Sequence, residues 1–473
     1  MIDLTNITIE KAHNSLTNRE YTVRELVDAY LKNIDEKNAN INAYLEIYKS
    51  LDEQIVRAQK MIDDGSAGVM TGIPVSIKDN MLVTGEHASA SSKMLEGFVA
   101  VSDATVIAKL KSAGAVLIGR TNMDEFAMGS STETSAYGIT RNPLNPDYVP
   151  GGSSGGAVSS VAMDGALVAL GSDTGGSIRQ PAGYTGLVGF KPTYGEVSRS
   201  GIIAMASSLD QVGPIAKTVA DAEILFNIIR GVDVMDETSI SETVVRDTRE
   251  IKKIGVPTNW IEQGGIEASV KKNFDETVEK LKNEGYEIVS VDLPITQYSL
   301  AVYYVLNTAE VSSNLARYDG LRYGLSKEGK TLQEVYEKTR GQGFGKEVRR
   351  RILLGAYILS HGYYDAYYKK ALDVQNVIRG ELAGVFKKVD VIMTPTAPFL
   401  PFKFGEKMND PIAMKLADLF LAPANIAGNP ALSIPSGDAE GNLKHSTHFL
   451  APMLADDALL SFGKKVEKIM TNY

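Results

Sequence analysis

The stretch that decides the fold opens with Pro150-Gly-Gly-Ser-Ser-Gly-Gly156 and closes with Gly171-Ser-Asp-Thr-Gly-Gly-Ser-Ile-Arg-Gln-Pro181. Between these two loops lies an apolar element that includes Val161, Leu167 and Leu170. A flexible Gly/Ser linker would not carry such interleaved apolar side chains, because it has no core to pack against. We therefore expect two ordered, serine-bearing loops that flank one buried element.

Two known glycine-rich motifs are alternative interpretations of this stretch. A phosphate cradle also exposes backbone N–H groups through glycines, but neither GxxxxGK[ST] nor GxGxxG occurs here. Residues Gly151-Gly-Ser-Ser-Gly155 match the GxSxG nucleophile elbow of α/β-hydrolases. That elbow directly follows a central strand, whereas the preceding segment Asn142–Pro150 contains three prolines. The prolines argue against the nucleophile elbow. The sequence of the loop alone leaves both the phosphate cradle and the elbow open.

Outside these loops, apolar runs of strand length alternate with segments of helical periodicity, which favours an α/β fold with parallel strands. The first ~60 residues are predicted to be helical, because Thr22-Val-Arg-Glu25 forms a capping box ahead of an apolar periodic run. Helices are also predicted at 105–112, 270–283 and 346–387. Strands are predicted at 73–77, 115–119, 254–257, 287–291 and 389–394, with a strand or buried helix end at 166–170.

No repeat, low-complexity tract or linker interrupts this alternation. We therefore expect a single domain over residues 1–473, with a helical N-terminal region at 1–65 and an α/β core at 66–473. The composition agrees with a large globular domain, since 44% of the 473 residues are hydrophobic and 23% are charged.

Charge and residue usage exclude several classes of function. The net charge of -9 disfavours direct binding of a nucleic-acid backbone by the surface as a whole. The absence of cysteine excludes disulfides, thiolate nucleophiles and Cys-ligated metal sites. No basic segment followed by an apolar one begins the chain, and no stretch of 18 uncharged apolar residues occurs, so a cytoplasmic protein is expected. No metal site is expected from the scattered histidines His13, His87, His361, His445 and His448.

Four ordered motifs resemble the amidase signature family. They are Gly72-Ile-Pro-Val-Ser-Ile-Lys-Asp-Asn80, the loop at 150–156, Asp173-Thr-Gly-Gly-Ser-Ile-Arg179 and Gly189-Phe-Lys-Pro-Thr193. Two further segments, 122–134 and 362–368, are similar to the A subunits of tRNA-dependent amidotransferases. The resemblance covers nearly the whole chain and implies one large amidase domain with a mixed central sheet covered by helices on both faces.

The resemblance implies a Ser-cis-Ser-Lys triad at Ser177, Ser153 and Lys78. A serine hydroxyl needs a base within hydrogen-bond reach, and without a positioned histidine a lysine is the remaining candidate. The lysine must be neutral, so its pKa of ~10.4 must fall by several units, which burial can achieve. Lys78 follows the apolar-rich run Ile73–Ile77, although a surface lysine beside Asp79 is the alternative from sequence alone.

The same resemblance implies an oxyanion hole built from backbone N–H groups of Thr174, Gly175, Gly176 and Ser177. Glycine lets the chain wrap around a developing charge without a Cβ in the way. A tight turn is the structural alternative for Gly175-Gly176, and both can hold, because such a hole is built from a turn.

A glutamine pocket needs a cation for the carboxylate and an anion for the ammonium. By the resemblance these are Arg351 and Asp418, with Tyr303 as a polar wall. Arginine suits a carboxylate, because its planar fork donates two parallel hydrogen bonds. Arg350 is the main rival, since Arg349, Arg350 and Arg351 are adjacent.

The resemblance implies that the chain hydrolyses glutamine through a serine acyl-enzyme. The ammonia would serve ATP-dependent conversion of Glu-tRNA(Gln) to Gln-tRNA(Gln), or of Asp-tRNA(Asn) to Asn-tRNA(Asn). The implied partners are a tRNA-binding, kinase-like B subunit and a small C subunit, in a heterotrimer without membrane association. No cofactor is expected in this chain, and ATP and Mg²⁺ belong to the partner's reaction. A stand-alone amidase and a catalytically silent anion-binding scaffold are the competing hypotheses.

One segment departs from the family pattern. After a predicted strand at Leu432–Pro435, family members continue with a Gly-Leu-Gln-Ile-like run, whereas this chain has Lys444-His-Ser-Thr-His-Phe-Leu450. The resemblance therefore does not fix the packing of the last strand.

Overall fold

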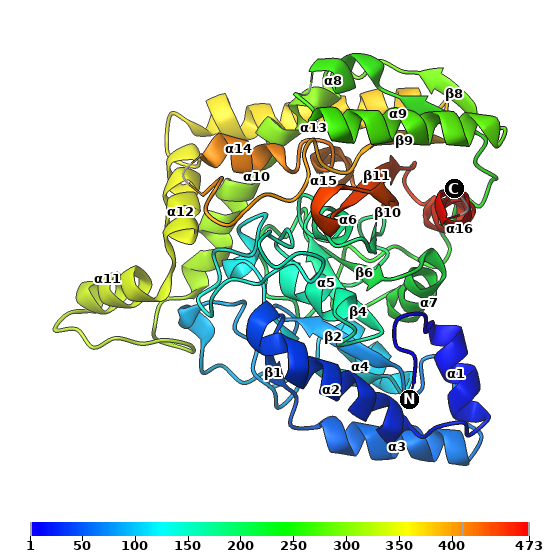
Figure 1. Cartoon of the computed structure of the whole chain (residues 1–473). Helices are drawn as coiled ribbons and strands as arrows, with labels where there is room; N and C mark the ends of the chain where they lie inside the picture. Colours follow the sequence, from blue (N-terminus) through cyan, green and yellow to red (C-terminus); the bar gives the residue numbers. More distant parts are fainter. Residues whose placement is uncertain (1, 264, 409, 472–473) are drawn as a thin grey trace.

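The computed structural model describes residues 2–263, 265–408 and 410–471 and is built around one mixed sheet (Figure 1). The strand order is β1-β3-β2-β4-β6-β5-β10-β11-β9-β7-β8, within an 11-stranded sheet. The strands are β1 (Tyr44–Ile47), β2 (Pro74–Lys78), β3 (Val116–Thr121), β4 (Val168–Asp173), β5 (Val188–Lys191), β6 (Gln211–Ala216), β7 (Lys253–Val256), β8 (Glu287–Ser290), β9 (Val391–Pro395), β10 (Ala431–Asp438) and β11 (Lys444–Leu450).

Helices connect and cover these strands. The α-helices are α1 (Ile9–Thr17), α2 (Val23–Ile41), α3 (Leu51–Asp63), α4 (Thr105–Ser112), α5 (Gly155–Ala162), α6 (Arg179–Tyr184), α7 (Val219–Ile229), α8 (Thr258–Gln263), α9 (Ala268–Asn283), α10 (Ser299–Asn314), α11 (Leu332–Gly343), α12 (Lys346–Ile358), α13 (Lys370–Val385), α14 (Pro411–Leu416), α15 (Ala422–Ala427) and α16 (Asp456–Thr471). Short 3-10 turns are η1 (Lys93–Leu95), η2 (Glu125–Ala127), η3 (Thr296–Tyr298), η4 (Leu315–Arg317) and η6 (Glu440–Asn442), and η5 (Asp365–Lys369) is a π-helical turn.

The expectation of parallel strands holds only on the two flanks of the sheet, and the edge strand β1 is antiparallel to β3. Strand β2 is parallel to β3 and β4, and β7 is parallel to β8 and β9. The central pairs from β4 to β9 are antiparallel. Helical crossovers such as α4 and α9 produce the parallel pairs, whereas β10 and β11 are joined by a short connection that requires an antiparallel hairpin.

The predicted strands and the helices at 105–112 and 270–283 are confirmed by β2, β3, β4, β7, β8, β9, α4 and α9, with bounds shifted by a few residues. The N-terminal helices and the capping box are also confirmed, since the Glu25 amide donates to Thr22 Oγ1 and the Thr22 amide donates to Glu25. The prediction that the first ~60 residues are all helical was wrong at β1, which pairs with β3. A strand of four residues is too short to be recognised from the alternation of polar and apolar residues.

The predicted helix at 346–387 was also wrong as one element. Helix α12 ends at Ile358, and α13 begins only at Lys370. Gly362 lies between them with φ +90°, a left-handed conformation that breaks a right-handed helix.

Helices cover both faces of the sheet. Alternate residues of a strand point to opposite faces, and Leu432 of β10 faces Gly463 of α16. Its neighbour Ser433 pairs instead with Thr396, which lies against Gly183 of α6. The structure therefore confirms the mixed sheet covered on both faces.

The divergent segment at 444–450 is an interior strand of this sheet. Strand β11 pairs with β10 on one side and with β9 on the other. His448, Phe449 and Leu450 are buried there. Among the described helices, none is long and apolar enough to cross a membrane.

Candidate active site

The site begins where two neighbouring parallel strands end. Lys78 is the last residue of β2, and Asp173 is the last residue of β4. Because parallel strands present their carboxyl ends at the same edge, the segments that follow meet there. The loop that carries Ser153 and Ser154 leads into α5, which packs against both strands.

Lys78 is fully buried and contacts serine oxygens. Its Nζ lies 2.8 Å from Oγ of Ser153, 2.8 Å from Oγ of Ser154 and 3.2 Å from the carbonyl oxygen of Ser172. Burial lowers the pKa of Lys78 from 10.5 to about 7, although nearby carboxylates oppose the shift. The alternative of a surface lysine is excluded by this burial.

The three contacts of Lys78 are not equivalent. The Ser172 carbonyl is only an acceptor, and the Ser154 hydroxyl donates its own proton to that carbonyl at 3.1 Å, so both accept from Lys78. A neutral lysine has two N–H donors and one lone pair. In a neutral Lys78 the lone pair would be left for the Ser153 hydroxyl, whereas a protonated Lys78 donates to Ser153 as well.

The loop around Ser153 has a backbone that requires glycine. The Gly152–Ser153 peptide bond is cis, and Gly151 has φ +83°. A Cβ at Gly152 would lie 2.2 Å from Oδ2 of Asp124. The Gly-Gly pair thus lets the chain turn Ser153 toward Lys78 against a buried carboxylate.

The second loop is organised by Asp173. Its carboxylate accepts the amide of Gly176 at 2.9 Å and the amide of Ile178 at 3.2 Å, on either side of Ser177. Ser177 is only partly buried, and its carbonyl accepts the Ser154 amide at 3.2 Å. The two loops therefore meet at Ser177 and Ser154, next to the residue that contacts Lys78.

The residues predicted for the oxyanion hole lie in this same loop. Thr174 donates through Oγ1 to Asp210 at 2.7 Å, which fixes the start of the loop. The Gly176 amide is already engaged by Asp173, so an oxyanion would have to share that donor. The oxyanion hole therefore stays a prediction, with the backbone amides of Thr174, Gly175 and Gly176 as its donors.

Tyr303 and Asp418 converge on the second loop from other elements. A Cβ at Gly175 would lie 2.7 Å from the Tyr303 ring, and a Cβ at Gly176 would lie 3.1 Å from Oδ1 of Asp418. Both Tyr303 and Asp418 are buried. Residues far apart in the chain therefore border the glycines that precede Ser177.

Arg351 differs clearly from Arg350. The Arg351 side chain is 6% exposed, donates to Glu347 at 2.7 Å and to Asn307 Oδ1 at 3.0 Å. Arg350 is 35% exposed and is held by Glu347 as well. Although burial opposes it, the Tyr304 phenol and Glu347 hold the pKa of the Arg351 guanidinium above its ordinary value.

A cavity of about 350 Å³ lies beside these residues. Its lining includes Ser130, Tyr304, Arg350 and Arg351. Ser130 donates to Oδ2 of Asp418 at 2.7 Å, which connects the cavity wall to that carboxylate. Burial raises the pKa of Asp418 to about 7. A cavity of this size suits a small polar molecule.

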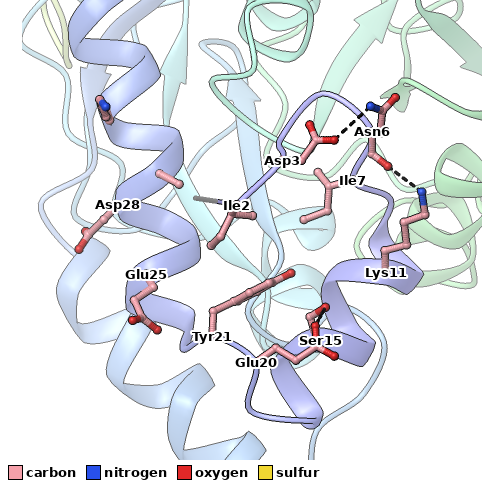
Figure 2. A pocket seen from close by; sticks show the side chains of 12 residues that line it. Ile2, Asp3, Asn6, Ile7, Lys11, Ser15, Glu20, Tyr21, Glu25 and Asp28 are labelled. Atoms are coloured by element: carbon pink, nitrogen blue, oxygen red, sulfur yellow. Dashed lines mark hydrogen bonds between the residues drawn. The ribbon is translucent and has the colours of Figure 1, made fainter.

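A larger, open cavity of about 880 Å³ lies elsewhere, between the N-terminal segment, α1 and α2 (Figure 2). Its lining consists of residues between Ile2 and Lys32. None of the predicted site residues lines it, so it is separate from the site described above. No group of histidine and acidic side chains suited to a metal ion was found among residues 2–263, 265–408 and 410–471.

Sequence reasoning did not single out several residues of the site. Ser154 contacts Lys78 as closely as Ser153 does, and its adjacency in the Gly-Gly-Ser-Ser motif was an available signal. Asn307 reaches Arg351 from α10, and its Nδ2 has no partner among the described residues. No sequence pattern connects Asn307, Glu347 or Ser130 to the site, because they meet only in the fold.

Comparison with known proteins gives the family. The family model described as Amidase matches residues 25–460. The chain belongs to the amidase family. Among curated amidase-family relatives, the A subunit of the glutamyl-tRNA(Gln) amidotransferase of Caldanaerobacter subterraneus subsp. tengcongensis is 47% identical over 448 residues, covering 93% of this chain and 92% of the relative.

Solved structures of the amidase family share the fold. The A subunit of the glutamyl-tRNA(Gln) amidotransferase from Thermotoga maritima has a TM-score of 0.81 at 39% identity, covering 99% of this chain and 96% of that one. The peptide amidase from Stenotrophomonas maltophilia also has a TM-score of 0.81, at 26% identity, covering 99% of this chain and 97% of that one. This amidase-family chain therefore resembles both amidotransferase subunits and an amidase named for peptides.

Proposed function

We propose that this chain is the glutaminase subunit of a tRNA-dependent amidotransferase. The observation that carries the proposal is a buried lysine of lowered pKa with its Nζ 2.8 Å from Ser153, beside a loop that exposes Ser177. Relatives named as amidotransferase A subunits, at 47% and 39% identity over more than nine-tenths of the chain, support the amidotransferase assignment.

The proposed reaction starts at Ser177. Its Oγ attacks the side-chain carbonyl carbon of glutamine, while its proton passes to Ser153 and the Ser153 proton passes to the lone pair of Lys78. The C–N bond of the tetrahedral intermediate then breaks. The proton held by Lys78 passes back through Ser153 to the leaving nitrogen, which departs as ammonia. Water attacks the acyl-enzyme by the same proton route and releases glutamate.

The glutamine pocket is proposed from three side chains. Arg351 would bind the α-carboxylate through guanidinium donors that Glu347 and Asn307 leave unused, and Asp418 would bind the α-ammonium. Tyr303 would form the wall against Gly175. The cavity of about 350 Å³ next to Arg351 and Ser130 provides the approach for the substrate.

The proposed partners perform the second half of the reaction. A tRNA-binding, kinase-like B subunit and a small C subunit would use the ammonia to amidate Glu-tRNA(Gln) or Asp-tRNA(Asn) in the cytoplasm. ATP and Mg²⁺ would act in that partner reaction. The net charge of -9 supports leaving tRNA binding to the partner.

A pull-down of native partners followed by a glutaminase assay tests this proposal. We expect glutamine hydrolysis that increases when the partners are present, and amidated tRNA when ATP and misacylated tRNA are added. Glutaminase activity with no partner and no dependence on tRNA would contradict the amidotransferase assignment.

A stand-alone amidase is the second candidate, and the structural likeness to a peptide amidase favours it over a catalytically silent scaffold. Its expected signature is rapid hydrolysis of simple primary amides without any partner. The buried Arg351 next to the cavity argues for a substrate with a carboxylate, which simple amides lack.

A further inference from the structure

The side chain of His448, on strand β11, lies at the end of a buried chain of hydrogen bonds that leads to the loop around Ser177. His448 belongs to the segment at 444–450 that departs from the family pattern. It is 1% exposed. The proposed function gives this histidine no role, and His448 is far from Lys78 in the sequence.

Arg179 connects His448 to the loop. The Arg179 Nε donates to Oδ2 of Asp173 at 2.9 Å, and Nη2 donates to Oδ1 of Asp173 at 3.0 Å and to Asn425 at 2.7 Å. Its Nη1 donates to the carbonyl of Leu421 at 3.1 Å and lies 2.9 Å from Nε2 of His448. Every N–H of this fully buried guanidinium is thereby used.

The chemistry of this contact fixes the state of His448. A guanidinium can only donate, so Nε2 of His448 must be the acceptor and must carry no proton. The imidazole is therefore neutral, with its proton on Nδ1, which lies 3.3 Å from Oγ1 of Thr394. Burial and the adjacent Arg179 agree with this, because both lower the pKa of His448 well below 6.5.

Asp173 transmits the position of Arg179 to the loop. One carboxylate oxygen accepts the Gly176 amide and the other accepts the Ile178 amide, so the same group that pairs with Arg179 holds both neighbours of Ser177. Removing the acceptor at residue 448 would leave one N–H of a buried guanidinium without a partner. Because an unsatisfied buried donor is costly, we expect the guanidinium to shift toward another acceptor and to move the Asp173 carboxylate with which it pairs.

We propose that His448 is a positioning residue, which fixes Arg179 and Asp173 and thereby the loop that carries Ser177. The inference rests on the proposed function, because it concerns the geometry of the same nucleophile. The inference gives a role to the segment at 444–450, which differs from the family pattern. Its strand, β11, supplies the neutral nitrogen that accepts the last free N–H of Arg179.

Three variants test the role in the complex with its native partners. His448→Leu should lower kcat for glutamine by about tenfold while KM changes less than about twofold, because the loop that carries Ser177 shifts while Arg351, held by Glu347 and Asn307, stays in place. His448→Gln should keep kcat within about threefold of the parent, because Oε1 of glutamine can accept from Arg179. His445→Leu is the matched control on the same strand, since His445 Nδ1 has no partner among the described residues, and it should leave kcat unchanged.

A further variant and a second measurement test the inference if His448→Leu does not fold. His448→Phe keeps an aromatic ring but has no nitrogen or sulfur acceptor, and hydrogen exchange of peptides spanning 174–181 reports the loop directly. Exchange should be faster in His448→Phe than in the parent and near the parent in His448→Gln. An unchanged kcat in His448→Leu or His448→Phe, or an equal loss in His448→Gln, would overturn the inference. If the parent complex itself hydrolyses no glutamine, the proposed function fails first, and the exchange result still decides the role of His448.

Discussion

At the scale of single residues, the proposed mechanism makes Lys78 and Ser177 parts of one catalytic unit. We expect Ser177→Ala to lower glutaminase kcat by at least about 10³-fold, because the nucleophile is lost, and Lys78→Ala to be comparably severe. The double variant should be little worse than either single one, since members of a unit are not additive. Steady-state kinetics of the three variants, with melting temperatures as the folding control, check this. If the loss in the double variant equals the product of the two single losses, Lys78 acts independently of Ser177.

The pKa of Lys78 predicts how activity depends on pH. Because only the neutral amine can accept a proton, kcat should rise as pH increases through about 7 and then level off. The folded pKa lies below the unfolded value of 10.5, so the unfolded chain binds more protons between about 7 and 10.5. This group therefore makes the free energy of unfolding rise with pH in that window. A pH profile of Lys78→Arg checks the role, since an arginine cannot lose its proton and an active variant would refute it.

Substrate selectivity should depend on Arg351 and Asp418. Arg351→Lys removes one arm of the fork, and we expect kcat/KM for glutamine to fall by roughly 10- to 150-fold, with little change for an uncharged primary amide. Asp418→Asn should show the same selectivity through the ammonium. Parallel kinetics on both substrates measure this.

Arg350→Lys is the matched control for Arg351, because the two arginines share Glu347 but Arg350 is more exposed. A glutamine-selective loss in Arg350→Lys alone would move the carboxylate site to Arg350. No selective loss in any of these variants would favour the stand-alone amidase.

At the scale of elements, glycines decide how closely the loops approach other helices. Gly175→Ala would place a Cβ 2.7 Å from the Tyr303 ring of α10, so the loop must shift, and kcat should fall by roughly 10- to 100-fold. Gly380, inside α13, has nothing within 4 Å of an added Cβ. Gly380→Ala should therefore leave kcat unchanged and raise the free energy of unfolding by about 0.5–1 kcal/mol. Kinetics and denaturant unfolding of both variants test the contrast.

The elements that could be predicted are those with a strong local signal. The capping box at Thr22 begins α2, and the strands with apolar cores were found within a few residues. Strand β1 was missed because four residues give too little periodicity, and the break at Gly362 was missed because the apolar period continues on both sides. Strands β5 and β6 were not predicted either. Local patterns therefore predict many of the elements but not the antiparallel order of the central strands, which depends on pairing between distant segments.

At the scale of the whole molecule, the candidate site was predicted from family motifs, and physical pattern alone predicted little of it. The burial of Lys78 followed from an apolar strand, but its partners Ser153 and Ser154 come from another loop. Arg351 and Asp418 were placed by resemblance, and their neighbours Asn307 and Ser130 were not, because no spacing in the sequence connects them. The sheet brings these residues together only when distant segments have paired.

The position of the β10–β11 hairpin has a consequence for synthesis on the ribosome. Strand β5 ends at Lys191, yet its outer neighbour β10 begins at Ala431, and β11 is in turn the neighbour of β9. Until that hairpin has emerged, the nascent chain exposes unpaired edges on β5 and β9, and such edges are prone to pair with other chains. The last tenth of the chain thus joins two parts of the sheet, one of which ends at β5 long before Ala431 and the other at β9 shortly before it. A ribosome that stalls just before Ala431 would leave both edges open to aggregation and to chaperones.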